Sequence, residues 1–231
     1  MSARIDHLET SGTFSLDGGT WDVDNNVWIV GDDSEVVVID PAHSPEQVAE
    51  AVGDRKVTAI LLTHGHDDHI RAVAETQKLL GNPPVHLNPE DMVLWEMVYP
   101  DAKPEEKLED GQTITVGGVT LTALHTPGHS PGSTCFYIAD GVTVPEVAAE
   151  VAEKAGAAGV ENPILISGDT LFEGGPGATG RSYSSFDTII ESISTRLFQL
   201  PEETVVLTGH GPATAIGLEK PHLQEWIDRG E

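Results

Sequence analysis

The feature that most constrains this chain is one short run, Thr63-His64-Gly65-His66-Asp67-Asp68-His69, which gathers three imidazoles and two carboxylates. It directly follows an apolar stretch, 57–62, whose β-branched residues predict a buried strand. Gly65 permits a tight turn, and residues 70–80 have a helical periodicity that Gly81 closes. The histidines and carboxylates are therefore predicted at the C-terminal end of a strand and on the first turn of a helix.

This concentration of side chains indicates a metal site. Neutral imidazoles and ionised carboxylates are the ligands that a borderline cation such as zinc accepts. No Lys or Arg follows the run before Arg71, so gathering these groups is costly unless a cation lies among them. A solvated polar loop is the alternative interpretation. It accounts for one or two of the five residues rather than for all of them.

Three more metal-competent side chains follow predicted strands elsewhere in the chain. His129 comes after the strand 119–123, Asp169 after 164–167 and His210 after 205–208. Each is flanked by Gly or Pro, and loops at strand ends are where functional sites are usually built. A single His or Asp in such a turn more often shapes the turn itself. Recurrence at four strand ends favours a shared site.

The whole set, HxHxDH at positions 64 to 69 followed by His129, Asp169 and His210, resembles the metallo-β-lactamase superfamily of metal-dependent hydrolases. The resemblance extends from Asn25 to His210 and implies an α/β fold, the four-layer αββα sandwich, with metals at one sheet edge. It also implies two divalent metal ions as cofactors; zinc is expected, and iron and manganese are the alternatives.

Carried over by position, the resemblance assigns a role to each of these residues. It implies that the first ion is held by His64, His66 and His129, the second by Asp68, His69 and His210, and that Asp169 bridges both. Asp40, which ends the strand 36–39, matches the family aspartate that orients the metal loop.

Within the superfamily, Gly168-Asp169-Thr170-Leu171-Phe172 with Gly180-Arg181 downstream looks most like the glyoxalase II-type branch. This resemblance implies a thioesterase acting on acyl conjugates of a small cellular thiol. A water held between the two ions, with its pKa lowered to about 7, would attack the acyl carbon. The expected catalytic residues are Asp169, which joins the ions, and Asp68, which is expected to hold the proton of the nucleophile.

Several alternatives to this function stay open. The segment after His210 has only Lys220 and Arg229 as cations, so the basic residues with which glyoxalase II proteins usually bind glutathione are not predicted here. A thiol with neutral hydroxyls, such as mycothiol, needs no such basic residues. A hydrolase of lactone or β-lactam rings would use the same metals, and a persulfide dioxygenase would use one iron. A non-enzymatic metal-binding protein is disfavoured, because a closed structural site needs no bridging carboxylate.

The order of elements predicts a single domain over residues 1–231, because both halves of the chain supply ligands. Strands are expected near 27–30, 36–39, 57–62, 85–87, 113–116, 119–125, 134–138, 164–167 and 205–208, and helices near 70–80, 90–99 and 186–197. An Ala/Glu-rich stretch, 147–158, predicts a surface helix within an insertion at about 142–162, with Pro145 near its start. A solvated insertion is favoured over a lid, because this stretch has no aromatic side chain to hold a ligand.

Charge and composition limit the partners. A net charge of -26, from 12 basic and 38 acidic residues, opposes binding to phosphate backbones and anionic membranes. We therefore expect a small-molecule substrate, no nucleic acid and no membrane, with the oligomeric state open.

The single cysteine, Cys135, is expected to be a buried, inert thiol. The N-terminus lacks the apolar core of a signal peptide, and no stretch has the roughly 20 apolar residues of a membrane helix, so a cytoplasmic location is expected.

The remaining candidates are weaker. Met92, Trp95 and Tyr99 share one face of the helix 90–99, and a core-facing role is favoured over a wall beside the metals. The segment 181–183 offers polar substrate contacts. The other histidines are expected at the surface (His7, His222), in a hydrogen-bonded turn (His43) or packed on a strand (His86), and His125 is unassigned.

Overall fold

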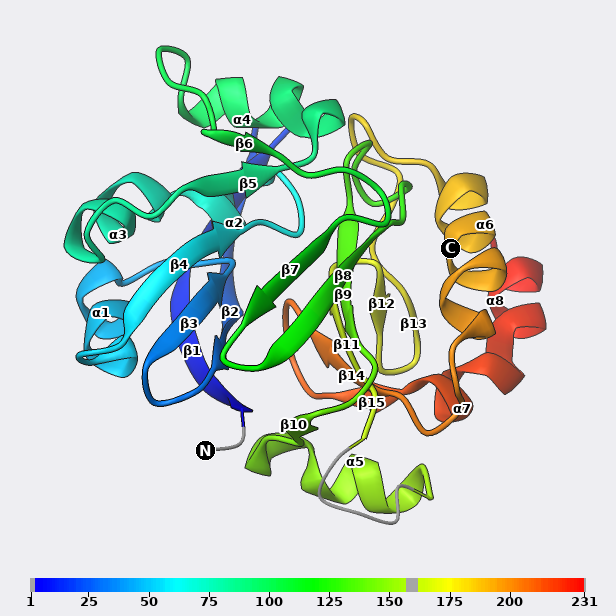
Figure 1. Ribbon diagram of the computed structural model, residues 1–231. Helices are drawn as coiled ribbons and strands as arrows, with labels where there is room; N and C mark the ends of the chain where they lie inside the picture. The colour runs from blue at the N-terminus through cyan, green and yellow to red at the C-terminus, as the bar shows by residue number, and fades with distance from the viewer. Residues whose placement is uncertain (1–2, 157–161, 231) are drawn as a thin grey trace.

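Two β-sheets pack face to face, with helices on both outer sides (Figure 1). This computed structural model describes residues 3–156 and 162–230. The predicted α/β sandwich is confirmed, and both sheets are mixed, with parallel and antiparallel neighbours.

The first sheet has seven strands in the order β10-β1-β2-β3-β4-β5-β6. Strands β3, β4, β5 and β6 run parallel, whereas β1 and β2 form an antiparallel pair. The strand bounds are β1 Ala3–Leu16, β2 Gly19–Gly31, β3 Glu35–Ile39, β4 Lys56–Leu61, β5 Val85–Leu87, β6 Glu106–Lys107 and β10 Val142–Thr143.

The second sheet has six strands in the order β15-β14-β11-β9-β8-β7. Its parallel pair, β11 and β14, lies next to the antiparallel strands β9, β8 and β7. The bounds are β7 Thr113–Val116, β8 Val119–His125, β9 Thr134–Ile138, β11 Ile164–Gly168, β14 Val205–Thr208 and β15 Thr214–Ala215; a small hairpin, β12 Leu171–Phe172 with β13 Gly175–Pro176, stands apart.

The core has three layers because successive residues of a strand point to opposite faces of a sheet. Val37 and Ile39 of β3 point between the sheets, toward Phe136 and Ile166 of the second sheet. Their neighbours Val36 and Val38 point outward and pack against helix α1, Pro45–Val52.

The outer faces of both sheets are covered by helices. On the first sheet, α3 (Val73–Leu79) and α4 (Met92–Val98) pack beside β4, and the short 3-10 turn η1, Pro89–Asp91, leads into α4. On the second sheet, α6 (Phe186–Thr195) and α8 (Leu223–Arg229) pack over Leu165 and Val206, and α7 spans Ile216–Glu219. Among the described residues, no helix has both the length and the hydrophobicity needed to cross a bilayer.

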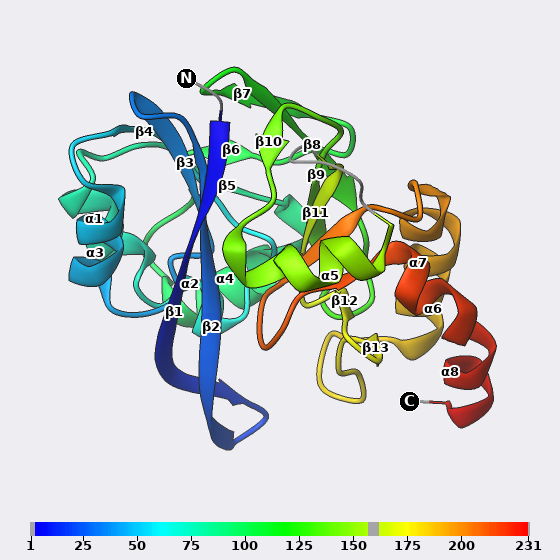
Figure 2. The same cartoon turned by 90° about the horizontal axis from the view of Figure 1, so that it is seen from below.

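The N-terminal hairpin differs from the sequence prediction. Residues 3–16 form β1, which pairs with the whole of β2, and the two strands extend as a long ribbon past the body of the sheet (Figure 2). The pattern predicted only 27–30, because the projecting half of the ribbon is solvated and lacks a continuous apolar face. His7 was expected at the surface, but it is half-buried, packs on Trp28 and contacts Asn26.

Two predicted helices also differ from the structure. The stretch 70–80 is broken: α2, Asp67–Ile70, ends before α3 begins at Val73. In the insertion, the turn η2 (Glu146–Ala148) and α5 (Ala149–Lys154) bury Ala148 and Ala152 in the core, so this part is packed rather than merely solvated. The remainder of the predicted helix, 157–158, lies outside the described residues.

Candidate metal centre

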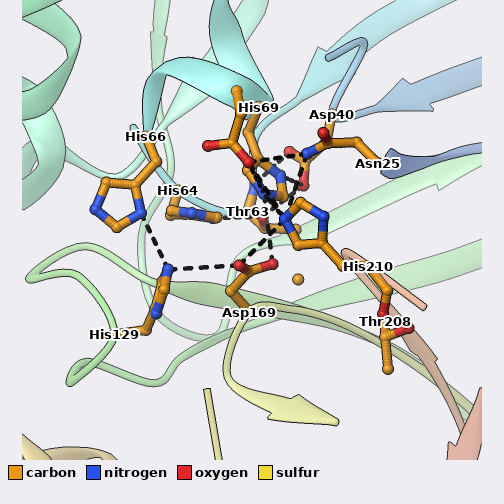
Figure 3. A network of polar contacts seen from close by, with 12 residues as sticks. Asn25, Asp40, Thr63, His64, His66, His69, His129, Asp169, Thr208 and His210 are labelled. Atoms are coloured by element: carbon orange, nitrogen blue, oxygen red, sulfur yellow. Dashed lines mark hydrogen bonds and ion pairs between the residues drawn. The ribbon is translucent and has the colours of Figure 1, made fainter. Parts of the chain in front are cut away.

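The strand ends of both sheets bring all seven predicted ligands together. Figure 3 labels each of them except Asp68. The run 64–69 leaves the end of β4, and Asp169 and His210 follow the ends of the parallel strands β11 and β14. His129 lies in the loop between β8 and β9. His66 precedes α2 as its N-cap, so Asp68 and His69 lie on the first turn of that helix, as predicted.

His64, His66 and His129 form one cluster. One ring nitrogen from each lies within 4.8 Å of the others, and Nδ1 of His66 is 3.0 Å from Nε2 of His129. All three side chains are buried, with His64 only 1% exposed. Three imidazoles in this arrangement match the donor set of a catalytic zinc site.

Asp68, His69 and His210 form a second cluster beside the first. The Nε2 atoms of His69 and His210 lie 3.2 Å apart, and Oδ2 of Asp68 is 3.2 Å from Nε2 of His210 and 3.6 Å from Nε2 of His69. This donor set includes a carboxylate, unlike the three-histidine cluster.

Asp169 lies between the two clusters. Its Oδ2 is 3.5 Å from Nε2 of His129 in the first cluster and 3.4 Å from Nε2 of His210 in the second. Its Oδ1 is 3.4 Å from Nε2 of His69. This carboxylate thus faces both donor sets, which is the placement that a bridging ligand requires.

The buried donor atoms fit a resident cation. Nε2 of His64 and Oδ1 of Asp169 are buried without a hydrogen-bond partner among the described residues. Buried polar atoms are nearly always satisfied, so two such atoms facing the clusters indicate a missing partner. The clusters are therefore consistent with a binuclear metal site, and their donors do not by themselves select zinc, iron or manganese.

The two clusters differ in protonation. Burial lowers the pKa of His64 well below its ordinary value and that of His66 to about 3, so both imidazoles are neutral at pH 7. Burial opposes the charged form of His210 too, but Asp169 and Asp68 outweigh it and raise its pKa to about 10. Without metal, a proton on His210 therefore compensates the neighbouring carboxylates of Asp68 and Asp169, and metal binding there would release it.

Asp40 orients the ligand loop, as the sequence predicted. Its Oδ1 accepts from the backbone N–H of Thr63, and its Oδ2 accepts from the Thr63 hydroxyl and lies 3.0 Å from Nδ1 of His69. Hydrogen bonding at Nδ1 leaves Nε2 of His69 facing the cluster.

Asn25 is a polar residue of the site that the sequence analysis missed. It lies on β2 and donates through Nδ2 to Oδ2 of Asp68 at 3.1 Å. Its Oδ1 lies 3.2 Å from Nε2 of His43, which was expected in a hydrogen-bonded turn, and both side chains are buried. The resemblance, which begins at Asn25, was the one signal that reached this residue; β2 approaches α2 in space, not in sequence.

A cavity of about 210 Å³ opens onto the clusters. Its apolar wall comes from the β1–β2 hairpin, and its opposite wall comes from the segment after β13. The guanidinium of Arg181 lies 3.8 Å from the centre of the Trp21 ring and 5.3 Å from that of Phe14, so it stacks on the hairpin. The lining residues are Phe14, Trp21, Val23, His66, Asp68, His129, Asp169, Ala178, Arg181, Ser182, Ser184 and His210.

The other candidate residues lie away from the ligands. Trp95 is buried in the core beside β4, with Met92 and Tyr99 packed against the same cluster, which confirms the core-facing interpretation. Cys135 is buried, and burial raises the pKa of its thiol to about 11. His86 is half-buried on β5, His125 contacts the carbonyl of Pro131, and His222 is exposed.

Comparison with known proteins gives the family. The model of the metallo-beta-lactamase superfamily matches residues 20–144, more than half of the chain. The chain belongs to that superfamily. It is accordingly a metal-dependent hydrolase with the metallo-beta-lactamase fold, as its two mixed sheets and flanking helices show.

Two related proteins and one solved structure show which members of the superfamily this chain is similar to. The chain is 31% identical over 208 residues to the probable metallo-hydrolase YqgX of Bacillus subtilis, covering 84% of this chain and 89% of that protein. It is 28% identical over 203 residues to the hydroxyacylglutathione hydrolase GloC of Haemophilus influenzae, covering 82% of this chain and 86% of that protein. The structure is similar to that of TTHA1623 in a di-iron-bound form, with a TM-score of 0.65, 31% identity, and coverage of 91% of this chain and 96% of the other.

Proposed function

We propose that this metallo-hydrolase cleaves thioesters formed between an acyl group and a small cellular thiol. The observation that carries the proposal is the pair of adjoining His/Asp clusters at the floor of a small, partly apolar cavity. The similarity to GloC, a hydroxyacylglutathione hydrolase, supports the thioester class. A thioester suits such a site because a thiolate leaves without a strong general acid, whereas an amine needs one.

The residues of the cavity favour water as the nucleophile. Oγ of Ser182 donates to Asp17, and Oγ of Ser184 donates to the carbonyl of Arg181, so neither hydroxyl contacts a histidine that could act as its base. Cys135 is buried, with a raised pKa. Within the described residues, the catalytic groups facing the cavity are thus the ligand clusters themselves.

The chain would hold two divalent ions through the residues already described. His64, His66 and His129 would bind one, Asp68, His69 and His210 the other, and Asp169 would contact both. Ions bound there would polarise an acyl carbonyl and make water a nucleophile at neutral pH.

Proton transfer and substrate binding would be carried out by side chains that line the cavity. Asp68 lines the cavity, with its Oδ2 held by Asn25, and is positioned to accept a proton from an attacking water. Phe14, Trp21 and Val23 would bind the apolar part of the acyl group and exclude bulk water. Arg181, stacked on Trp21, is the one Arg or Lys among the lining residues and would face a polar or anionic part of the substrate.

The test is a substrate panel combined with metal quantification on the native protein. S-lactoyl and S-formyl conjugates of several thiols, among them glutathione and mycothiol, are compared with a lactone and a β-lactam. We expect two metal ions per chain and the highest kcat/KM on a thioester. A lactone preferred by orders of magnitude in kcat/KM would overturn the thioesterase proposal, and oxygen consumption with a persulfide would indicate a dioxygenase instead.

A further inference from the structure

Asp91 is a fully buried carboxylate that no part of the proposed chemistry uses. It ends the turn η1, is 0% exposed, and forms no ion pair with a Lys or Arg of the described residues. Instead it accepts three hydrogen bonds. Its Oδ2 accepts from the backbone N–H of Gly65 at 2.8 Å and from Oγ of Ser130 at 2.7 Å, and its Oδ1 accepts from the backbone N–H of Gly132 at 2.5 Å.

These three donors belong to the two loops that carry the three-histidine cluster. Gly65 lies between His64 and His66, and Ser130 directly follows His129. One carboxylate therefore joins two loops that lie far apart in the sequence. Burying a carboxylate is costly, and three donors are what make it tolerable here.

Both loops sit tightly against Asp91. A Cβ atom added at Gly65 would lie 3.0 Å from the backbone oxygen of Asp91. A Cβ atom added at Gly132 would lie 2.8 Å from Cγ of Asp91. A side chain larger than glycine does not fit at either position without a shift, so both loops pack directly against Asp91.

We propose that Asp91 is a positioning residue that sets the separation of the 64–66 loop and the His129 loop, and thereby the affinity of the three-histidine cluster for its ion. The second cluster is oriented by other groups, because Asp40 and Asn25 contact His69 and Asp68. The inference rests on the metal site of the proposed function, but not on the thioester substrate.

The carboxylate, rather than any side chain of its size, is required. Both oxygens of Asp91 accept, whereas an Asn side chain accepts through one atom and donates through the other. If the amide introduced by Asp91→Asn directs its oxygen toward Gly65 and Ser130, its NH₂ group opposes the N–H of Gly132; if it is flipped, the NH₂ group opposes the N–H of Gly65. Either orientation leaves a buried N–H unsatisfied and pushes one loop away.

The experiment follows zinc binding to the metal-free protein by NMR of the histidine rings. Signals of His64, His66 and His129 report the first cluster, and those of His69 and His210 report the second. We expect Asp91→Asn to weaken zinc binding at the first cluster by about 10- to 100-fold, the range for loss of an orienting neighbour, and to leave the second within a few-fold. Ser130→Ala removes one of the three bonds and is expected to give a smaller loss at the same cluster.

Glu219→Gln is the matched control. Glu219 is also buried, at 4% exposure, and accepts from the Thr214 hydroxyl and the backbone N–H of Gly174, away from both clusters. We expect it to lower the unfolding temperature without changing zinc affinity.

Each contrary outcome is distinct. Wild-type zinc affinity at the first cluster of Asp91→Asn would overturn the positioning role, and an equal loss in Glu219→Gln would show that Asp91 acts only through stability. If Asp91→Asn does not fold, Ser130→Ala serves as the test instead. An unchanged zinc affinity at the first cluster of Ser130→Ala would then overturn the proposal. A wild-type protein whose histidines bind no zinc would contradict both this inference and the metal site, whereas normal zinc binding without thioester hydrolysis would contradict the proposed function alone.

Discussion

At the scale of single residues, the site separates groups that face the cavity from groups that orient them. Asp169 belongs to the first kind, because it lies 3.4 to 3.5 Å from histidines of both clusters. Asn25 belongs to the second kind, because its amide donates to Asp68 from a neighbouring strand. Substitutions at the two kinds of residue should therefore differ in how much activity and metal binding they remove.

Asp169→Ala should abolish hydrolysis and lower metal content while the fold is kept. The substitution removes the carboxylate that faces both clusters and leaves two cationic sites close together without its charge. We expect activity to fall by more than the roughly 100-fold that loss of an orienting neighbour causes. Elemental analysis, kcat/KM and far-UV circular dichroism check this. Full turnover with normal metal content would show that Asp169 only shapes its turn.

Asn25→Ala should give a milder defect, with roughly 10- to 100-fold lower activity. Its amide donates to Asp68 at 3.1 Å, so the variant leaves that carboxylate less well oriented. Asn25→Asp keeps the size but places a second carboxylate against Asp68, and it should therefore be at least as damaging. Metal titration and kcat measure both variants. An Asn25→Asp enzyme as active as the wild type would contradict the role given to this amide.

At the scale of elements, the β1–β2 hairpin and the segment 177–185 form opposite walls of the cavity. They are tied together by Asp17, which accepts from the backbone N–H of Ser182 at 3.0 Å and from its hydroxyl at 2.6 Å. Arg181 adds a stacking contact on Trp21. The hairpin otherwise projects from the sheet (Figure 2), so these contacts position it over the site.

Asp17→Ala should raise KM by roughly twofold to tenfold with little change in kcat. The substitution releases the 177–185 segment from the hairpin, so substrate binding must order both walls, whereas the ligand clusters are untouched. Steady-state kinetics on the preferred substrate check this. Asp22→Ala, at an exposed position on the same hairpin, is the control and should match the wild type. A fall in kcat with unchanged KM would assign Asp17 to the chemistry instead.

At the scale of the whole molecule, the net charge of -26 governs which partners can approach. Nucleic-acid binding depends on releasing counterions from phosphates neutralised by Lys and Arg. This chain has 12 such residues against 38 acidic ones, and several are paired, such as Arg55 with Asp6 and Arg196 with Asp110.

We expect no binding or cleavage of DNA or RNA at physiological salt. Fluorescence anisotropy with labelled duplex and single-stranded oligonucleotides, followed by gel analysis after incubation with the metal-loaded enzyme, checks this. The thioester substrate turned over in the same buffer is the control for active protein. Specific cleavage at low enzyme concentration would show that the ligand clusters act on phosphodiesters despite the charge.

The sequence by itself predicted the metal donors and the fold class. The 64–69 run, His129, Asp169 and His210 each follow a strand whose apolar pattern is local and strong, so their place at strand ends was predictable. Local patterns were misleading where local preference and tertiary contact differ. The polar β1 strand forms because it pairs with β2, and the helix after the metal loop breaks between Ile70 and Val73.

Only the tertiary structure decided which residues orient the donors and which enclose the substrate. Asn25 reaches Asp68 from strand β2, Asp91 joins two loops, and Arg181 stacks on the N-terminal hairpin. Each of these contacts joins residues distant in sequence, and no periodicity or spacing encodes such a contact. The residues predicted as ligands can be recognised from the sequence, but the way their side chains are oriented depends on the packing of the two sheets.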